Sequence, residues 1–296
     1  TIGLRAGPDS IDPHWSTLGS QAEALRHIYD TLVDVDDTLQ LMPGLAVSWE
    51  PIEDTVWEFK LREGVTFHDG TPFTAEDVKF SIDRIPEVTG PMSMTLYTKY
   101  VDRVEVIDDY TLHVHTKGIA PALPNDFTRM FIVPSETGEG VGNEEFNSGE
   151  AAIGTGPYNF VSWEPKGDLV LERFEGHWRG DSPWERVVRK EIPDDAARVA
   201  ALRSGQVDMI NYVPASDYLA DARGALFLDK DSRTVIDAGG NTHKAVHYNQ
   251  NGDLLNVIHN DKCADGLGIF FSGMARARGL SEQDMSKLAL QSTGHP

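Results

Sequence analysis

Residues 45–85, LAVSWEPIEDTVWEFKLREGVTFHDGTPFTAEDVKFSIDRI, form the stretch that decides the fold of this chain. In the run WEFKLR, apolar residues alternate with charged ones, which is the period of a half-buried strand. Asp69-Gly70 is a turn dipeptide, because glycine tolerates a positive φ and aspartate accepts hydrogen bonds from nearby backbone. The stretch therefore predicts a strand, a tight turn and then a helix.

The helix is predicted over residues 74–85. Thr74 lies three residues before Asp77, the spacing of a capping box, which satisfies free amide groups at a helix start. Phe73 and Val78 occupy the two positions of a hydrophobic staple. The apolar face then continues along the same side of the helix.

Further elements follow on both sides of this stretch. Residues 21–32 show a helical apolar stripe, and Ser20 with Glu23 has the spacing of a second capping box. Residues 101–116 read as a hairpin that turns at two aspartates. Residues 187–212 repeat a strand, a helix and a strand, which is the rhythm of an α/β lobe.

Three motifs carry a resemblance to a known family. They are LAxSWE, the block WxFxLRxGVxFHDGxPFTAEDVxFS, and GTGPY at residues 154–158. Together they resemble the extracytoplasmic solute-binding proteins of ABC importers, in the peptide/nickel-type group (family 5), over about residues 2–219. The resemblance implies an α/β, periplasmic binding protein-like fold of type II, with mixed sheets and flanking helices.

The resemblance also implies a division into lobes. Residues 1–44 and 152–218 would form one discontinuous α/β lobe, and residues 45–151 a smaller lobe inserted into it. Residues 219–296 match nothing in the family and are shorter than the lobe expected there. The chain is therefore expected to be truncated, a shortened relative, or altered in its reading frame.

In the resembling family, the loop at residues 15–19 lies in the ligand cleft, at the start of a helix whose free amides could meet a ligand carboxylate. Segments around Met94 and Arg129 approach the same cleft. Arg129 is a cation within an apolar run, so it either forms a structural ion pair or meets an anionic group of the ligand. The resulting ligand-binding candidates are Trp15, Thr17, Leu18, Gly19, Met94, Tyr97 and Arg129.

Composition excludes several other classes of protein. The 47 acidic residues against 26 basic ones give a net charge of −21, which opposes binding to nucleic acid. No apolar run reaches the roughly 18–20 residues needed to span a bilayer. Cys263 is the single cysteine, so no disulfide within the chain is possible. The chain opens at Thr1 without a leader, so a secretory signal would have been removed or not included.

A metal site is one alternative. His113 and His115 are two residues apart on a predicted strand, so their rings project from the same face and could chelate Zn²⁺ or Ni²⁺. No third ligand is visible at metal spacing, and exposure to solvent is the simpler reading. His68 is expected to shape the turn beside Asp69. We therefore expect no metal and no cofactor.

An enzyme is a second alternative. The chain lacks GxSxG, GxGxxG and the phosphate-loop pattern. Adjacent acids such as Asp108-Asp109 and Asp194-Asp195 suit a turn and a helix cap better than a separated acid and base. The sequence thus offers no catalytic set, and the resemblance implies a ligand-capturing receptor rather than an enzyme.

The function that the resemblance implies is capture of a peptide or similar small solute and its delivery to an ABC permease in the inner membrane. The expected location is periplasmic or extracytoplasmic, with membrane association only through the permease, and the expected state is a monomer. Nickel, sugars, opines and glutathione remain open as ligands. The rival hypothesis is a receptor fragment that folds but no longer binds.

Overall fold

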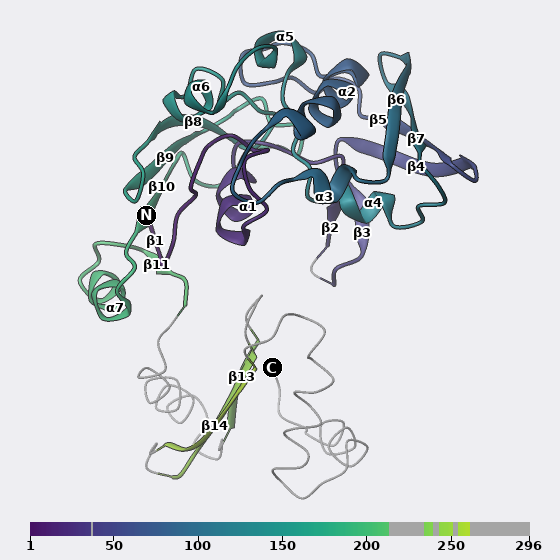
Figure 1. Ribbon diagram of the computed structural model, residues 1–296. Coiled ribbons are helices and arrows are strands. Elements are labelled where there is room, and N and C mark those ends of the chain that lie inside the picture. The colour runs from purple at the N-terminus through teal and green to yellow at the C-terminus, as the bar shows by residue number, and fades with distance from the viewer. Residues whose placement is uncertain (37, 213–233, 239–242, 251–253, 261–296) are drawn as a thin grey trace, which may run out of the picture. The chain divides into compact units, whose positions relative to one another are not determined.

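The computed structural model describes residues 1–36, 38–212, 234–238, 243–250 and 254–260. The chain divides into two compact units, Thr1–Tyr212 and Val213–Pro296. Figure 1 shows both with their elements labelled, and each unit is described by itself.

A five-stranded sheet, with the order β11-β1-β10-β9-β8, lies on one side of the first unit (Figure 1). β1 lies between β10 and β11 and is parallel to both, while β9 runs antiparallel to β8 and β10. Its strands are β1 (Ile2–Leu4), β8 (Tyr158–Trp163), β9 (Asp168–Arg173), β10 (Arg186–Glu191) and β11 (Met209–Ile210).

The predicted strand–helix–strand unit is confirmed between β10 and β11. Its helix is α7 (Asp195–Arg203), and the side chain of Asp194 caps it by accepting a 2.7 Å hydrogen bond from the amide of Ala197. Gly205 ends the helix at a φ of +74°, a conformation that favours glycine. The first strand of the chain, β1, fills the place between β10 and β11.

A four-stranded antiparallel sheet, with the order β4-β5-β7-β6, lies on the other side of this unit. It contains the predicted hairpins, and a two-stranded ribbon leads into it. These strands are β2 (Val33–Val35), β3 (Leu41–Pro43), β4 (Ala46–Glu53), β5 (Val56–Leu61), β6 (Val101–Asp108) and β7 (Thr111–Thr116).

The predicted helix in the deciding stretch is α2 (Ala75–Arg84). Its start follows the sequence signal, because the Asp77 carboxylate accepts a 2.8 Å hydrogen bond from the amide of Thr74. The turn before it also forms as predicted. Gly70 has a φ of +88°, and the Asp69 carboxylate accepts from both the amide and the hydroxyl of Thr71.

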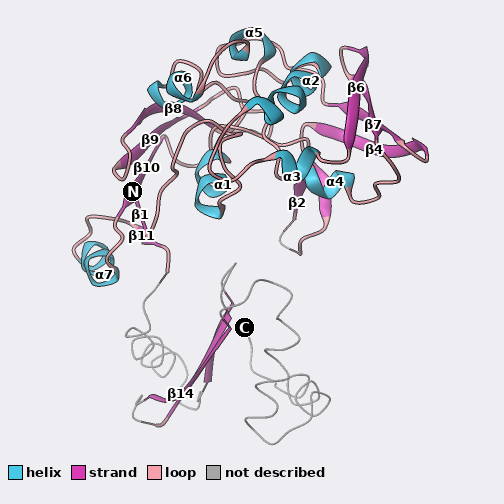
Figure 2. Cartoon of the chain, viewed as in Figure 1, coloured by secondary structure: helices cyan, strands magenta, loops and turns pink. Residues whose placement is uncertain are grey.

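The predicted helix over residues 21–32 is shorter than expected. The helix begins at Gly19, which places Ser20 inside it, so the expected capping box does not form. It ends at Leu25, and residues 26–28 form a turn. Two carbonyls of this turn face the GTGPY motif instead of continuing the helix: the amides of Gly156 and Tyr158 donate to the carbonyls of Ile28 and His27. The short helices, shown in cyan in Figure 2, are α1 (Gly19–Leu25), η1 (Ile85–Glu87), α3 (Thr95–Thr98), α4 (Leu123–Asp126), α5 (Ser135–Gly138) and α6 (Asn143–Ser148).

Two hydrophobic cores organise the first unit. One packs α2 on the four-stranded sheet, where the rings of Phe59 and Phe127 lie 5.3 Å apart between centroids. The other packs α1 and α6 on the five-stranded sheet. Phe131, Val133 and Phe146, which fall within residues 45–151, belong to this second core. The lobe boundaries stay a prediction, and their last residues, 213–218, lie outside the described part.

The second unit contains a three-stranded antiparallel sheet with the order β12-β13-β14. Asn251-Gly252 is a turn dipeptide that predicts a hairpin between its flanking segments, and β13 and β14 on either side of it do pair; residues 251–253 themselves lie outside the described part. A glycine-rich segment at 266–274, Cys263 and a helix predicted over 281–290 lie outside it as well. The strands are β12 (Thr234–Ala238), β13 (His243–Tyr248) and β14 (Leu254–Asn260).

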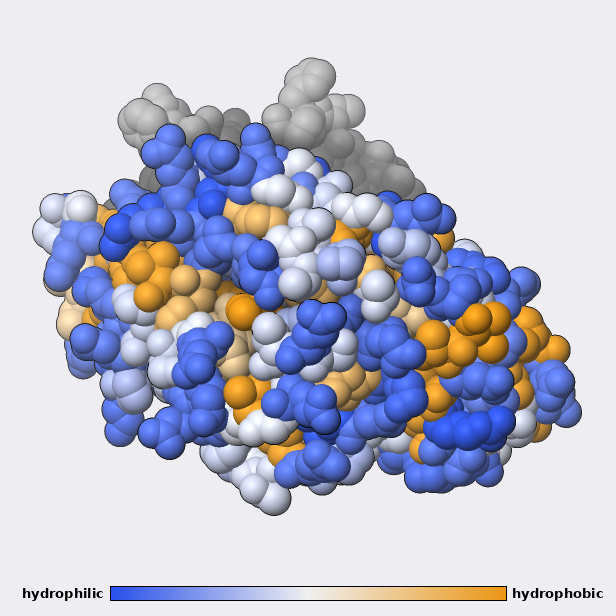
Figure 3. All heavy atoms as spheres, turned by 90° about the horizontal axis from the view of Figure 1, so that it is seen from above, coloured by the Kyte–Doolittle hydropathy of each residue, from blue (hydrophilic) through white to orange (hydrophobic). Residues whose placement is uncertain are grey.

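The face shown in Figure 3 is mostly hydrophilic, in keeping with the acidic composition. Apolar atoms gather at the end formed by the four-stranded sheet, whose strands carry the exposed residues Val47, Ile52 and Ile107. Among the described helices, none is both long and apolar enough to cross a membrane.

Candidate functional site

The predicted ligand loop, residues 15–19, runs directly into α1. Ser16 is buried, and it pairs with Met92 in a parallel bridge. The side chains of Trp15, Thr17 and Leu18 are half-buried, and Gly19 is exposed. The loop is therefore fixed through its backbone while its side chains keep access to solvent.

The segment that leads to Met94 and Tyr97 lies beside this loop. The two backbones are in contact at Gly90, where an added Cβ would lie 1.7 Å from the carbonyl oxygen of Trp15. Tyr97 is half-buried against the core. Met94 is only 3% exposed and packs within the core, so its side chain offers almost no surface to a solute.

Arg129 follows α4, which packs against α3. Its side chain is exposed, and among the described residues no ion pair or side-chain hydrogen bond engages it. The structural ion pair considered for Arg129 does not form there. Nearby on α4, burial raises the pKa of the Asp126 carboxyl, which the charge of Lys99 partly opposes.

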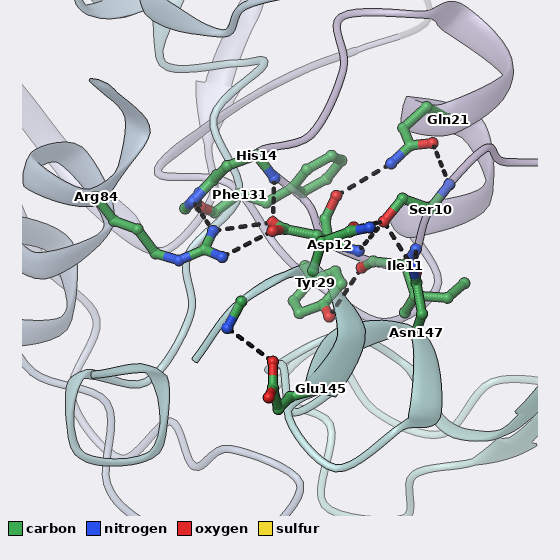
Figure 4. Close-up of polar contacts among 12 residues, drawn as sticks. Ser10, Ile11, Asp12, His14, Gln21, Tyr29, Arg84, Phe131, Glu145 and Asn147 are labelled. Atoms are coloured by element: carbon green, nitrogen blue, oxygen red, sulfur yellow. Dashed lines mark hydrogen bonds and ion pairs between the residues drawn. The ribbon is translucent and has the colours of Figure 1, made fainter. Parts of the chain in front are cut away.

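A buried ion pair anchors the chain just before the loop (Figure 4). Arg84, the last residue of α2, donates to both carboxylate oxygens of Asp12 at 2.9 and 2.7 Å. It also donates to Nδ1 of His14 at 2.9 Å, and Nε2 of His14 in turn donates to the carbonyl of Phe131 at 2.9 Å. The side chains of Asp12 and Arg84 are only 1% and 6% exposed. The bidentate geometry is the strong form of such a pair.

The backbone around Asp12 is satisfied just as fully (Figure 4). The Gln21 side chain accepts from the amides of Asp9 and Ser10 and donates to the carbonyl of Asp12. The side chain of Asn147 accepts from the amide of Ile11 at 2.8 Å. Buried backbone groups are costly when unpaired, so these bonds fix the path of the chain into residues 15–19.

This network also determines protonation. Burial, and then the charge of Arg84, lowers the pKa of His14 to about 4. The imidazole is thus neutral at physiological pH and can accept from Arg84 while donating to Phe131. Burial raises the pKa of the Tyr29 hydroxyl well above its usual range, and this hydroxyl donates to the carbonyl of Ile11.

Sequence reasoning missed this network, although α2 carries a signal for it. Asp77, Ser81 and Arg84 are buried and follow the spacing i, i+4, i+7, which places a polar stripe beside the apolar one. Ser81 bonds the backbone of Val133, and Asp77 accepts from the amide of Ser135. A polar stripe on a core helix indicates buried hydrogen-bonding partners.

The GTGPY motif joins the chain at the other end of α1. A Cβ at Gly154 would lie 2.0 Å from the carbonyl oxygen of Ile28, so only glycine permits this approach. His68 is predicted to shape the turn beside Asp69. Its ring instead reaches across to the GTGPY motif. Its Nδ1 accepts from the amide of Gly154, and its Nε2 bonds the carbonyl of Gly156 at 2.9 Å. Burial lowers the pKa of His68.

The histidine pair considered for a metal site is engaged differently. Nε2 of His113 lies 3.1 Å from a carboxylate oxygen of Glu58, and Nε2 of His115 lies 2.9 Å from one of Glu105. Each histidine thus pairs with one carboxylate on a neighbouring strand. No group of three or more metal-ligating side chains gathers within the part of the chain that the structure describes.

With this geometry in place, comparison with known proteins is informative. A family described as bacterial extracellular solute-binding proteins, family 5 Middle, matches residues 40–257, which is more than half of the chain. The chain belongs to this family. The matched range extends past residue 219, where the resemblance visible in the sequence ends.

Individual relatives agree with the family. The glutathione-binding protein GsiB of Pectobacterium atrosepticum is 28% identical over 210 residues, or 69% of this chain and 40% of GsiB. DppA of Helicobacter pylori, solved with the peptide STSA, gives a TM-score of 0.66 at 25% identity and covers 81% of this chain and 50% of DppA. AgaA of A. tumefaciens R10, solved with agropinic acid, gives a TM-score of 0.67 at 26% identity and covers 82% of this chain and 48% of AgaA.

These matches establish the fold class as that of family 5 periplasmic binding proteins, with mixed sheets flanked by helices. They also show that the chain spans about half the length of its relatives or less. The family and the solved neighbours are binding proteins rather than enzymes.

Proposed function

We propose that this chain is the ligand-capturing component of an ABC importer and takes a peptide or a peptide-like small solute. Family membership over residues 40–257 carries the proposal. The named ligands of its relatives are glutathione, a peptide and agropinic acid, which share carboxylate chemistry. A site for such ligands needs one fixed cation beside an apolar wall.

The contacts of this chain would come from the loop at 15–19, Tyr97 and Arg129. The loop supplies backbone groups in a path that the Asp12–Arg84 pair holds fixed, and Trp15 supplies an apolar surface. Arg129 supplies an exposed positive charge for a terminal carboxylate. Met94 would act through packing behind this surface.

The remaining properties that we propose, concerning cofactors, oligomeric state and location, follow from a role in which the chain only captures and delivers a solute. The chain would carry no cofactor and perform no chemistry, because the importer's ATPase supplies the energy. It would work as a monomer in the periplasm, associate with the membrane only through the permease, and leave nucleic acid unbound, since its net charge is −21.

A thermal-shift assay on the full chain tests the proposal, with pooled di- to pentapeptides, Ni²⁺ and oligosaccharides as separate arms. Ligand at about 100 times its dissociation constant adds roughly 2.7 kcal/mol of stability, which raises the melting temperature by several degrees. We expect a shift in the peptide arm that Arg129→Gln reduces. Arg186→Gln is the matched control, because Arg186 is an exposed arginine that pairs with Glu172 on the five-stranded sheet.

A cooperative melt that no arm moves would contradict the proposal and favour the rival, a receptor fragment that folds without binding. A shift of the melting temperature only with Ni²⁺ or only with oligosaccharides would leave the importer role standing but would contradict a peptide-like solute.

A further inference from the structure

A polar pocket opens at the C-terminal end of α1, and none of its lining residues belongs to the loop at 15–19. Its volume is about 350 Å³, within the range of cavities that hold small molecules. Residues after β9 form one wall, and the chain from α1 into β2 forms the other. The charged or titratable side chains lining it are Arg26, Asp30, Asp34, His177, Arg179 and Asp181.

His177 carries an unsatisfied buried nitrogen in this pocket. Its side chain is only 6% exposed, and Nε2 has no hydrogen-bond partner among the described residues. The nearest carboxylate oxygen, Oδ2 of Asp30, is 3.6 Å away. That oxygen already accepts hydrogen bonds from Trp178 at 2.9 Å and Thr155 at 3.0 Å. A buried polar atom without a partner is costly, so the position calls for an external one.

Asp30 has acceptor capacity left beside His177. Neutral donors hydrogen-bond its Oδ2, and its charge acts on Arg62 and on His177, which lies 3.6 Å from Oδ2. Its Oδ1 accepts no hydrogen bond from the residues described. Oδ1 of Asp30 thus keeps acceptor capacity for a small ammonium group, and the enclosed Nε2 of His177, 3.6 Å from Oδ2, lies next to it without a hydrogen-bond partner among the described residues.

Two arginines, Arg26 and Arg179, line the same pocket. Arg26 and Arg179 share the carboxylate of Asp34, at 3.2 and 2.8 Å, so one negative charge meets two guanidinium groups. The pKa of Asp34 is lowered overall: burial would raise it, but the hydrogen bonds from Val35 and Arg179 outweigh that effect. Arg179 also lies over the ring of Trp178, 4.4 Å from its centroid, which fixes its plane. Both arginines keep donors for a second carboxylate.

We propose that this pocket binds a free α-amino acid. The ammonium group would lie between Asp30 and His177, and the carboxylate would lie between Arg26 and Arg179. The lining offers two guanidinium groups and three carboxylates, so both charged groups of a zwitterion would meet opposite charges, whereas an ion of one sign would meet only one kind. The proposal is independent of the solute captured at residues 15–19.

Isothermal titration of the full chain with each common L-amino acid tests this site. Acetate, ethylamine and inorganic phosphate serve as probes that carry only one kind of charge. We expect at least one amino acid to bind with a dissociation constant below about 1 mM, and the single-charge probes to bind at least about tenfold more weakly. If acetate, ethylamine or phosphate bound as tightly as the amino acid, the proposal that the pocket selects a zwitterion would be overturned.

Substitution of residues that line the pocket tests whether the amino acid binds there. Arg179→Gln and His177→Gln should each weaken it about tenfold or more, while Arg186→Gln should leave it unchanged. Arg179 is 36% exposed, so its variant should fold even if the buried His177 variant does not. Absence of binding by every amino acid to the folded chain, or unchanged affinity in Arg179→Gln, would overturn the proposal.

Discussion

The two ends of α1 use the same kinds of side chain in opposite ways. At its N-terminal end, Asp12 and His14 precede the helix and Arg84 reaches them from α2; all three are buried, and each bonds another member of the group. Beyond its last residue, Asp30 and His177 are nearly as buried but leave an oxygen and a nitrogen without a hydrogen-bond partner among the described residues. A network that satisfies its own members fixes the backbone, and one that leaves atoms unsatisfied is able to bind something else. We therefore regard the first end as scaffold for the loop at 15–19 and the second as a binding site.

The largest expected effect comes from breaking the satisfied end. Asp12→Ala would leave the Arg84 guanidinium buried without its partner, which should lower the free energy of unfolding by about 3–5 kcal/mol. Urea denaturation followed by tryptophan fluorescence measures this loss. Replacement of both residues, Asp12→Leu with Arg84→Met, should recover part of it, because no charge then stays buried. A loss below about 1 kcal/mol for the single variant would contradict the assigned scaffold role.

The next effect concerns the backbone at the pocket end. Gly154→Ala places a Cβ 2.0 Å from the carbonyl oxygen of Ile28, so the chain must shift, and we expect a loss of about 2–3 kcal/mol. Gly118→Ala is the matched control, since nothing lies within 4 Å of its Cβ position. The same urea denaturation compares the two variants. Equal stability would show that the contact between GTGPY and α1 is not rigid.

Acid should destabilise the fold through a histidine at each end of α1, His14 before it and His27 after it. Burial lowers the pKa of His14 and of His27 to about 4, with the charges of Arg84 and Arg189 as the second causes. Between pH 6.5 and pH 4 the unfolded chain binds more protons at these sites than the folded chain, so stability falls as the pH falls through this window. The loss should be on the order of 2–3 kcal/mol per histidine. Melting temperatures measured from pH 7 to pH 4.5 should drop less steeply in His14→Gln.

The smallest effect is predicted at the pocket's ion pairs. Asp34→Ala removes a carboxylate shared by Arg26 and Arg179, whose side chains are 37% and 36% exposed. Solvent screens such pairs, so the loss of stability should stay below about 1 kcal/mol. Urea denaturation alongside Asp12→Ala provides the comparison. Similar losses in both variants would remove the distinction between the two ends of α1.

The sequence predicted best where contacts are local. The turn at Asp69-Gly70, the start of α2 at Thr74 and the Asp194 cap depend on neighbours within four residues, and all three form as predicted. The length of α1 could not be predicted this way, because the hydrogen bond from the amide of Gly156 to the carbonyl of Ile28 joins residues far apart in the sequence.

The candidate sites were harder to predict for the same reason. Arg84 meets Asp12 across 72 positions, and Trp178 meets Asp30 across 148. Neither pair has a local signature, apart from the polar stripe on α2. Burial of Met94 also depends on how α3 packs. The resemblance to a family brought together the loop at 15–19 and its neighbour, but it gave no indication of the pocket at His177.

A crossed calorimetric titration tests the two-ended account most directly. The wild-type chain, Arg129→Gln and Arg179→Gln would each be titrated with the peptide pool and with the amino acid that binds most tightly. The account predicts that Arg129→Gln weakens only the peptide, and Arg179→Gln only the amino acid, each by about tenfold. One variant that weakens both ligands, or neither variant weakening either, would contradict a division between the two ends of α1.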